Sequence, residues 1–273
     1  MSNQPGQFHF KYSGIFQDES VVRAYKYRPQ YPAELFELLT KLIPPDCAPR
    51  VVLDAGCGTG FVARPLAPLV ARVDAVDFSA AAIREGRCLP GGDHPHLRWI
   101  EGPVESAAVD PPYSLLTAGM SLHWFDWEVA FPRFARLLEP DGLFVAVGMR
   151  VEKPEWMQEE LGPVLARYSM NQEFRPFSEE EILDQLEERG LFRRMGSAQT
   201  EMIEWRQPVD EWVESIHARN GFSRDRMDPK LAAEADAVFK EIASRHVCGR
   251  EGSIVHRYSG TLVFGKPLQP DDR

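Results

Sequence analysis

The stretch VVLDAGCGTG, residues 51–60, decides the fold class, because an apolar run leads directly into three glycines at alternate positions. Gly56, Gly58 and Gly60 allow a sharp turn, and they allow a ligand to approach the main chain where a Cβ atom would collide with it. Such a loop between a buried strand and a helix is typical of the cofactor site of an α/β sheet. The stretch therefore predicts a cofactor-binding α/β domain.

Short apolar runs on both sides of this loop predict further buried, parallel strands. The predicted strands are 50–55, 72–77, 115–119 and 143–148, with a weaker one at 97–101. Helical stretches at 79–88 and 127–138 lie between them. This alternation implies right-handed crossovers and a mostly parallel sheet with helices on both faces.

After Gly148 the pattern changes to longer helical stretches. Helices are expected at 155–168, 178–189, 209–219 and 229–245, and strands around 193–205 and 254–264. The last strand is expected to form an antiparallel edge pair, which gives seven strands in all. We therefore divide the chain into an entry segment with a helix at 33–42 (1–45), a cofactor-binding core (46–150), its continuation with the edge strand (151–205), a helical lid (206–250) and a last strand with the tail (251–273).

The whole-chain composition argues against several kinds of partner. The formal net charge is -10 and the 31 Lys and Arg residues are scattered, which disfavours binding to nucleic acid. No run approaches the roughly 18 apolar residues that a membrane-spanning helix needs, and no signal peptide is visible. Four cysteines without a CxxC pair and seven scattered histidines predict neither a disulfide framework nor a metal site. We expect a cytoplasmic protein, and the sequence does not indicate its oligomeric state.

Asp77, at the end of the second strand in VDAVDFS, is the second anchor of the predicted site. A carboxylate there can accept hydrogen bonds from two ribose hydroxyls, which suits NAD and adenosylmethionine equally. Phe61 separates the two cofactors, because a GxGxxG dinucleotide site needs a small residue at that position. An NAD-dependent oxidoreductase is therefore disfavoured but stays open.

With these features the chain resembles the class I, Rossmann-like methyltransferases that depend on S-adenosyl-L-methionine. Within them it resembles the type-11 branch, which includes trans-aconitate and quinone-pathway methyltransferases. The resemblance rests on VLDAGCGTG, VDAVDFS, SLHWFD at 121–126 and LLEPDGLFVAVG at 137–148, and it covers about residues 20–150. It implies S-adenosyl-L-homocysteine as product and a small-molecule acceptor.

The resemblance also implies roles for individual residues. Besides the three glycines, the implied cofactor contacts are Asp54 near the methionine end, Asp77 and Phe78 at the ribose and adenine, Val104 and Glu105 at the adenine edge, Ala118 and Gly119 beside the methionine backbone, and Tyr25 and Arg28 in the entry segment YKYRPQYP, 25–32. Arg28 would pair with the methionine carboxylate, and a packing role is the alternative. Pro103 stands where the family often has an acid, which puts the adenine contacts in doubt. Pro68 predicts a short or kinked first helix.

His123 is the candidate catalytic residue. Methyl transfer is an in-line displacement, so the protein mainly has to align acceptor, methyl group and sulfur and to exclude water. An acceptor hydroxyl or carbon must also lose a proton, and His123 follows the fourth strand, whose end faces the predicted pocket. Packing against Trp124 is the alternative role, and His217, His246 and His256 are weaker candidates.

Aromatic residues of the predicted lid favour an apolar or aromatic acceptor, methylated on oxygen or carbon, as in natural-product biosynthesis. They are Trp156, Phe174, Phe177, Trp205, Trp212 and Phe222. Arg219 or Arg257 could hold an acceptor carboxylate, which keeps carboxyl methylation of a small acid open. A protein that binds S-adenosylmethionine or its product without catalysis is the remaining alternative.

Overall fold

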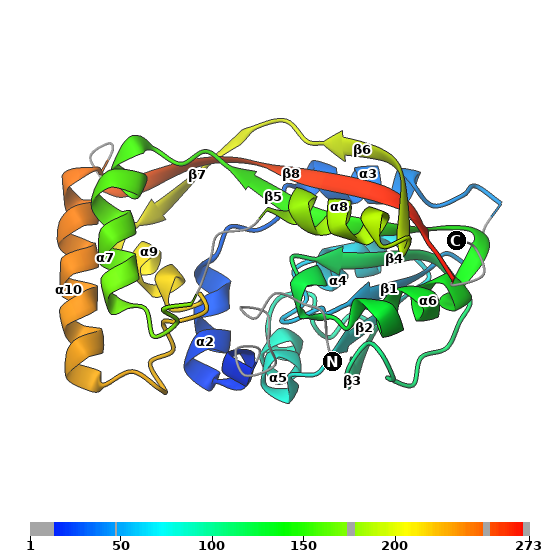
Figure 1. Cartoon of the computed structure of the whole chain (residues 1–273), viewed down its shortest axis with the longest axis horizontal. Helices are drawn as coiled ribbons and strands as arrows, with labels where there is room; N and C mark the ends of the chain where they lie inside the picture. Colours follow the sequence, from blue (N-terminus) through cyan, green and yellow to red (C-terminus); the bar gives the residue numbers. More distant parts are fainter. Residues whose placement is uncertain (1–13, 47, 174–177, 248–251, 270–273) are drawn as a thin grey trace.

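One sheet of eight strands runs through the molecule. A computed structural model of the chain describes residues 14–46, 48–173, 178–247 and 252–269. The strands lie in the order β3-β2-β1-β4-β5-β8-β6, and β7 pairs with the remaining length of β8. Figure 1 shows the sheet with its helices at one end and a group of helices, α7, α9 and α10, at the other.

The first five strands are parallel. They are β1 (Val51–Ala55), β2 (Arg72–Asp77), β3 (Leu97–Glu101), β4 (Tyr113–Gly119) and β5 (Leu138–Val151). Every residue of β1 is buried, because the strand has a neighbour on each side and apolar side chains on both faces. The predicted α/β class with a mostly parallel sheet is confirmed, and β2 and β3 have the predicted bounds.

Helices cover both faces of this parallel part. Leu53 of β1 packs in a cluster with α6 (Trp127–Leu137) and α8 (Glu179–Glu188), whereas Val52 packs with α3 (Ala33–Lys41) on the other face. After β1 the chain forms α4 (Ala63–Leu66) and one 3-10 turn, η4 (Ala67–Leu69), so the helix before Pro68 is short, as predicted. After β2 it forms α5 (Ala80–Cys88).

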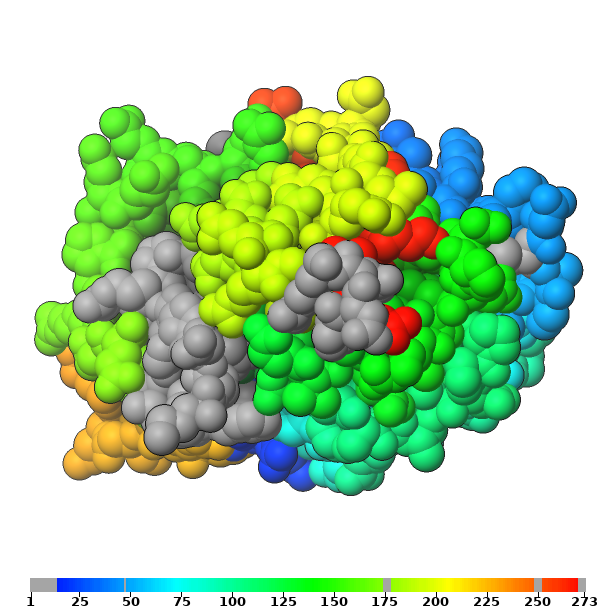
Figure 2. All heavy atoms as spheres, turned by 45° about the vertical axis from the view of Figure 1, so that its right-hand side comes forward, coloured from blue at the N-terminus to red at the C-terminus, as the bar shows by residue number. Residues whose placement is uncertain are grey.

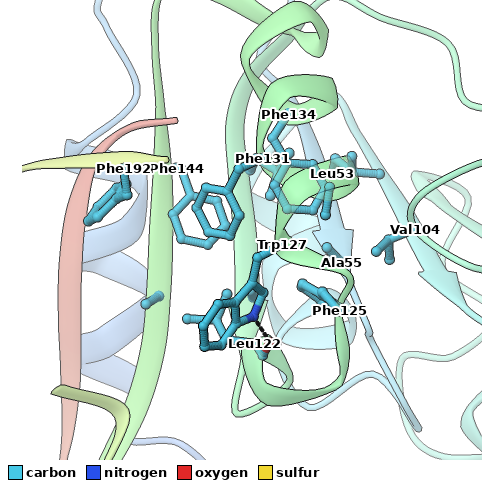
Figure 3. Packing of buried hydrophobic residues seen from close by; sticks show 14 of the residues in the cluster. Leu53, Ala55, Val104, Leu122, Phe125, Trp127, Phe131, Phe134, Phe144 and Phe192 are labelled. Atoms are coloured by element: carbon cyan, nitrogen blue, oxygen red, sulfur yellow. Dashed lines mark hydrogen bonds between the residues drawn. The ribbon is translucent and has the colours of Figure 1, made fainter. Parts of the chain in front are cut away.

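The larger aromatic cluster fixes the turn that carries His123. In Figure 3, Phe131, Phe144 and Phe192 gather between α6, β5 and β6, and Phe131 lies 5.3 Å from Phe144 between ring centroids. The indole nitrogen of Trp127 donates a 2.7 Å hydrogen bond to the carbonyl of Leu122. That bond holds the 3-10 turn η5 (Leu122–Trp124) against the core, just beyond the end of β4.

The antiparallel part of the sheet agrees with the prediction in its edge pair but not in its number of strands. The last strand, β8 (Ser253–Pro267), pairs antiparallel with the edge strand β6 (Phe192–Gln199), as predicted, and its other side pairs with β5. The single strand expected around 193–205 is two, because the chain leaves the ladder after Gln199 and re-enters as β7 (Ile203–Pro208). The sheet therefore has eight strands instead of seven. In Figure 2 the yellow-green surface of α8 and β6 lies next to the red surface of β8, with which β6 pairs.

The helices beyond the sheet form their own apolar cluster. Its elements are the π-helical turn η6 (Met157–Leu161), α7 (Gly162–Tyr168), α9 (Val209–Ile216) and α10 (Pro229–Arg245). Trp212 and Phe222, expected as pocket aromatics, are buried in this cluster with Phe239, so they serve as core. Phe174 and Phe177 lie outside the described residues. We propose to count η6 and α7 with the lid.

The lid is fastened to the entry segment, which contains η2 (Gly14–Gln17), α2 (Glu19–Ala24) and η3 (Tyr25–Tyr27). Arg226 donates from Nε and Nη2 to the two carboxylate oxygens of Asp18, at 2.6 and 2.9 Å. The Ser223 hydroxyl donates to the same carboxylate at 2.6 Å. In the described part of the chain no helix has the length and apolar character to cross a membrane.

Candidate cofactor and acceptor site

The three glycines of the loop after β1 are needed for two different reasons. All three have positive φ, namely +66° at Gly56, +54° at Gly58 and +81° at Gly60, a backbone region that L side chains rarely adopt. A Cβ on Gly56 would meet Ser121, and one on Gly60 would meet Trp99, both within 2.7 Å. Above Gly58, however, no described atom lies within 4 Å of that position. Gly58 is therefore the point of the loop where a ligand has room to approach the backbone.

Asp77 holds this loop in place. One carboxylate oxygen accepts a 2.7 Å hydrogen bond from the amide of Gly58, and the other accepts one of 2.8 Å from the amide of Ser79. The residue is only 6% exposed, and burial raises its pKa although both amide bonds act to lower it. Each oxygen has a further lone pair, so the predicted ribose contact and this loop contact are compatible.

Asp54 is a buried carboxyl with one unpaired oxygen. Its Oδ1 accepts a 2.8 Å hydrogen bond from Thr117 of the neighbouring strand β4. Its Oδ2 has no hydrogen-bond partner among the described residues. Burial raises the pKa of Asp54 to about 7, although the Thr117 hydroxyl and the nearby Ala63 amide act to lower it. A carboxyl left in this state is suited to receive a donor from a bound molecule.

The entry segment crosses the ends of the strands. The Tyr31 hydroxyl donates a 3.1 Å hydrogen bond to the carbonyl of Val147 in β5, and it also lies beside Gly119 at the end of β4. Tyr25 lies 6.2 Å from Phe61 of the glycine loop, between ring centroids, and the guanidinium of Arg28 lies 5.3 Å from the Tyr25 ring. The structure thus brings the predicted residues Tyr25 and Arg28 to the same edge of the sheet as the glycine loop.

Most of the residues predicted to contact the adenine edge have side chains that already contact other parts of the protein. Glu105 accepts a 2.8 Å hydrogen bond from the amide of Asp126 and so caps the start of α6. Val104 and Ala118 are buried in the apolar cluster below α6. Phe78, at the end of β2, is only partly buried. The adenine roles of these residues remain predictions.

His123 lies where it was expected, and its surroundings keep it neutral. Its ring lies 4.6 Å from that of Trp124, which in turn lies 5.4 Å from Phe16 of the entry segment. Burial lowers the pKa of His123 to about 3, and the positive charge of Arg28 lowers it further in the same direction. The catalytic role remains a prediction, but a titration near pH 6.5 is no longer expected from this group.

Two of the other candidate histidines are structural parts of the lid. The buried ring of His217 lies between the carbonyl of Phe222, 2.7 Å from Nδ1, and the carboxylate of Asp236, 2.6 Å from Nε2. His246 lies 2.7 Å from a Glu160 carboxylate oxygen and stacks on Trp156 at 4.5 Å. Both side chains join lid helices to one another.

Glu179 is a site residue that the sequence did not reveal. Its carboxylate occupies the space that a Cβ on Gly148 would need, beside the Thr261 hydroxyl. It begins α8, which packs on the turn that carries His123, and its charge acts on the Tyr31 hydroxyl. Burial raises the pKa of Glu179 to about 8, and Glu180 adds to the rise. The neighbouring acids Glu180 and Glu181 look the same in the sequence, so no local signal could have singled it out.

Comparison with known proteins gives a match to the core of the chain. Residues 52–142 match a family model described as a methyltransferase domain. Over this range the chain is similar to methyltransferases, which supports the resemblance seen in its sequence. The matched range of the methyltransferase domain holds the glycine loop, Asp77 and His123, but neither Glu179 nor the lid. The expected type-11 branch remains a prediction.

Curated relatives of the methyltransferase domain match it over a limited range. A malonyl-[acyl-carrier protein] O-methyltransferase of Halalkalibacterium halodurans is 29% identical over 104 residues, which are 36% of this chain and 38% of that protein. A probable S-adenosylmethionine-dependent methyltransferase of Mycolicibacterium smegmatis is 32% identical over 100 residues, with the same coverage of 36% and 38%. The chain thus matches well under half the length of either relative.

Solved structures share the fold of the methyltransferase domain over most of the chain. One described as a type II methyltransferase from Anaeromyxobacter dehalogenans has a TM-score of 0.61 and 24% identity, and the match covers 89% of this chain and 99% of that one. One described as a methyltransferase from an antibiotic biosynthesis pathway of Anabaena variabilis has a TM-score of 0.51, 19% identity and coverage of 84% and 96%. At these identities the likeness concerns the fold alone.

Proposed function

We propose that the protein binds S-adenosylmethionine at the carboxyl ends of β1, β2 and β4 and transfers its methyl group to a small-molecule acceptor. One observation carries the proposal. Gly58 combines a positive φ with open space above it, and its amide is bonded to the buried carboxylate at the end of the next strand. A strand-to-helix loop of this kind presents bare backbone to a ligand beside a ribose acceptor.

The residues around Gly58 fit this cofactor. Asp77 offers its remaining lone pairs to the ribose hydroxyls, and the partly buried Phe78 offers a ring face to the adenine. The unpaired oxygen of Asp54 suits the ammonium of the methionine end. Arg28 suits its carboxylate, since among the described residues it forms no ion pair. The cofactor, when bound, supplies a methyl group on a positively charged sulfur.

The chain's own residues then have three tasks. The entry segment, held to β5 by Tyr31, covers the strand ends and limits the access of water. The turn with His123 and the start of α8 border the space next to Gly119 and Gly148, where the acceptor is aligned. His123 is neutral, so its ring can accept a proton from the acceptor or orient it, but its low pKa makes it a weak base.

Carboxyl methylation of a small organic acid is supported by the same observation on His123, because a carboxylate acceptor needs no base. A binding protein without catalysis would share the cofactor contacts, so it differs only in turnover. The NAD alternative is weakened further by Phe61, whose bulky ring lies against Tyr25 instead of leaving room for helix packing on the strand.

Calorimetry with S-adenosylmethionine and with NAD tests the proposal on the intact protein and on two glycine variants. Gly252 is a matched control for Gly58, since it has a φ of +60° and equally open space but lies at the start of β8. We expect binding of S-adenosylmethionine but not NAD, and loss of at least about tenfold in affinity for Gly58→Val, because a side chain both blocks the ligand and strains the loop.

Gly252→Val should carry the same backbone strain without affecting the affinity. Equal affinities of the two folded variants would refute the assignment of the loop. Formation of S-adenosylhomocysteine in the presence of an acceptor separates an enzyme from a binding protein.

A further inference from the structure

Arg219 is an arginine of the lid without an ion partner. It follows α9, between the buried residues Ala218 and Phe222, yet its own side chain is exposed to solvent. Among the described residues its guanidinium forms no salt bridge and no hydrogen bond. The other arginines of the same loop are paired, Arg224 with Glu214 and Arg226 with Asp18, each through two hydrogen bonds.

Arg219 directly follows α9, the helix that packs on η3 of the entry segment and on both β7 and β8. Protein atoms around it desolvate the guanidinium, and together with the charge of Arg28 they lower its pKa to about 10. The charge of Arg28 also acts on His123, which lies just beyond the end of β4. The two guanidinium groups repel each other, and a bound anion would relieve this repulsion.

Strand β8 packs beside α9. Its alternate residues Ile254 and His256 face the lid, since Ile254 belongs to the lid cluster. The His256 ring stacks on Trp205 of β7 at 5.2 Å, and its buried Nε2 has no partner among the described residues. Arg219 is near enough to lower the pKa of His256, which burial has already lowered, to about 4. Arg257 points to the opposite face and pairs with Glu152, so it is not an acceptor residue, contrary to the expectation from the sequence.

We propose that Arg219 binds the carboxylate of the methyl acceptor, and that the acceptor is an apolar or aromatic carboxylic acid whose body lies along the Trp205–His256 pair. This inference rests on the proposed function. Arg28 serves the cofactor carboxylate, so a single guanidinium remains for the acceptor, which matches one negative charge. A phosphate dianion would call for more cations than the neutral histidines His123 and His256 provide. The flat aromatic pair favours a flat, apolar body.

The test measures binding to the protein saturated with S-adenosylhomocysteine. Three acids of increasing size, benzoate, cinnamate and indole-3-acetate, are compared by calorimetry with the corresponding amides, which have the same shape but no charge. We expect at least one acid to bind and its amide to bind about 10- to 100-fold more weakly, the usual effect of one charge-assisted pair. Inorganic phosphate should not compete with the acid.

The same acid is then measured on two variants. Arg219→Gln should weaken binding of the acid by the same 10- to 100-fold and leave binding of the amide unchanged. Arg257→Gln, on the opposite face of β8, should leave both unchanged. Arg219→Lys keeps the charge but loses the two-pronged geometry, so it should fall between the wild type and Arg219→Gln. The affinity for S-adenosylhomocysteine reports whether each variant is folded.

Equal binding of acid and amide to the wild type, binding of none of the three acids, displacement of the acid by phosphate, or full acid affinity in Arg219→Gln would each overturn the inference. If S-adenosylhomocysteine itself fails to bind to the wild type, the proposed function fails instead. The two failures are therefore distinguishable.

Discussion

At the scale of single residues, burial shifts the pKa values of the site's carboxyls and histidines in opposite directions. Asp54 and Glu179 hold their protons up to a pH of about 7 and about 8, while His123 and His256 stay neutral down to about 3 and about 4. At neutral pH the two histidines are uncharged and the two carboxyls are largely or partly protonated. On the acceptor side, Arg28 and Arg219 then supply positive charge, which favours a negatively charged acceptor.

His123→Ala tests the role of the histidine in this field. If His123 accepts or orients the acceptor proton, turnover should fall by about 10² to 10⁴-fold while the affinity for the cofactor stays nearly intact. The wild-type rate should show no inflection near pH 6.5 that the variant lacks, because the histidine is already deprotonated there. Steady-state kinetics from pH 5 to 9 check both points.

His94→Ala is the control for His123→Ala, since His94 lies near β3, away from the site, and packs on His96. A small effect of His123→Ala on turnover would point to an acceptor that is already deprotonated, such as a carboxylate. Loss of both fold and cofactor binding would support a packing role against Trp124.

The residues that could be predicted from the sequence are those whose place depends on local spacing. Gly56, Gly58 and Gly60 sit on the loop because glycine can adopt the positive φ angles that the turn after a buried strand requires, and Asp77 follows from its position at the end of the next strand. The contacts of Glu179 could not be predicted. They depend on how α8 packs against distant strands, which no short-range pattern encodes.

At the scale of secondary-structure elements, the start of α8 over β5 has a consequence for stability. Ser178 and Glu181 form a capping box, so the helix begins at Glu179 and the Glu179 carboxyl is held over Gly148. The folded pKa of about 8 lies above the ordinary value of 4.5. The folded state thus binds this proton more tightly than the unfolded state does. The contribution is fully present below about pH 4.5 and is lost as the pH rises through 8.

Glu179→Gln, which mimics the protonated carboxyl, should therefore gain stability relative to the wild type as the pH rises. We expect similar melting temperatures of the two proteins at pH 5 and a higher one for the variant at pH 9. Glu188→Gln, at the exposed end of the same helix, should show no such pH dependence. A difference between Glu179→Gln and wild type that is constant with pH would mean that the carboxyl titrates normally.

Most elements of the parallel sheet could be predicted, and the antiparallel ones only in part. β2 and β3 are short apolar runs with turn-forming residues on either side, so the residues at which they begin and end follow from the sequence. The break between β6 and β7 does not, because it arises where the Thr200 amide turns to the carbonyl of Gly260 in β8. The place of β8 between β5 and β6 likewise depends on pairings between segments far apart in the chain.

At the scale of the whole molecule, the lid and the entry segment behave as one unit. Asp18 receives hydrogen bonds from both Arg226 and Ser223, and Gln207 donates a 2.7 Å hydrogen bond to the carbonyl of Tyr27. Motion of the lid would therefore carry with it the segment that bears Tyr25 and Arg28. Opening of the acceptor side and opening of the cofactor side are coupled by these bonds.

Asp18→Ala should release the lid. Loss of the ion pair at a cost of about 1 to 2 kcal/mol would raise the open population about 5- to 30-fold, and with it the rate of tryptic cleavage in the segment 219–226. Glu19→Ala, which removes only an exposed pair with Arg23, is the control. Peptide mass spectrometry locates the cuts, and equal rates in both variants would show that the tie does not restrain the lid.

Adding cofactor and acceptor to the wild-type protein should slow cleavage across 206–250, because the closed lid is then the bound state. Equal cleavage rates with and without ligands would instead describe a rigid cap.

The position of β8 also governs the order in which the chain can reach its final form. Residues 253–267 lie between β5 and β6, so these two strands do not pair directly with each other. During synthesis every earlier strand leaves the ribosome before β8 does. Until β8 arrives, the β5 side of the parallel sheet remains an open edge, and β6 has no place to dock. Such an edge can pair with other nascent chains, so this protein should be more exposed to aggregation and more dependent on chaperones while it is being made than once it is complete.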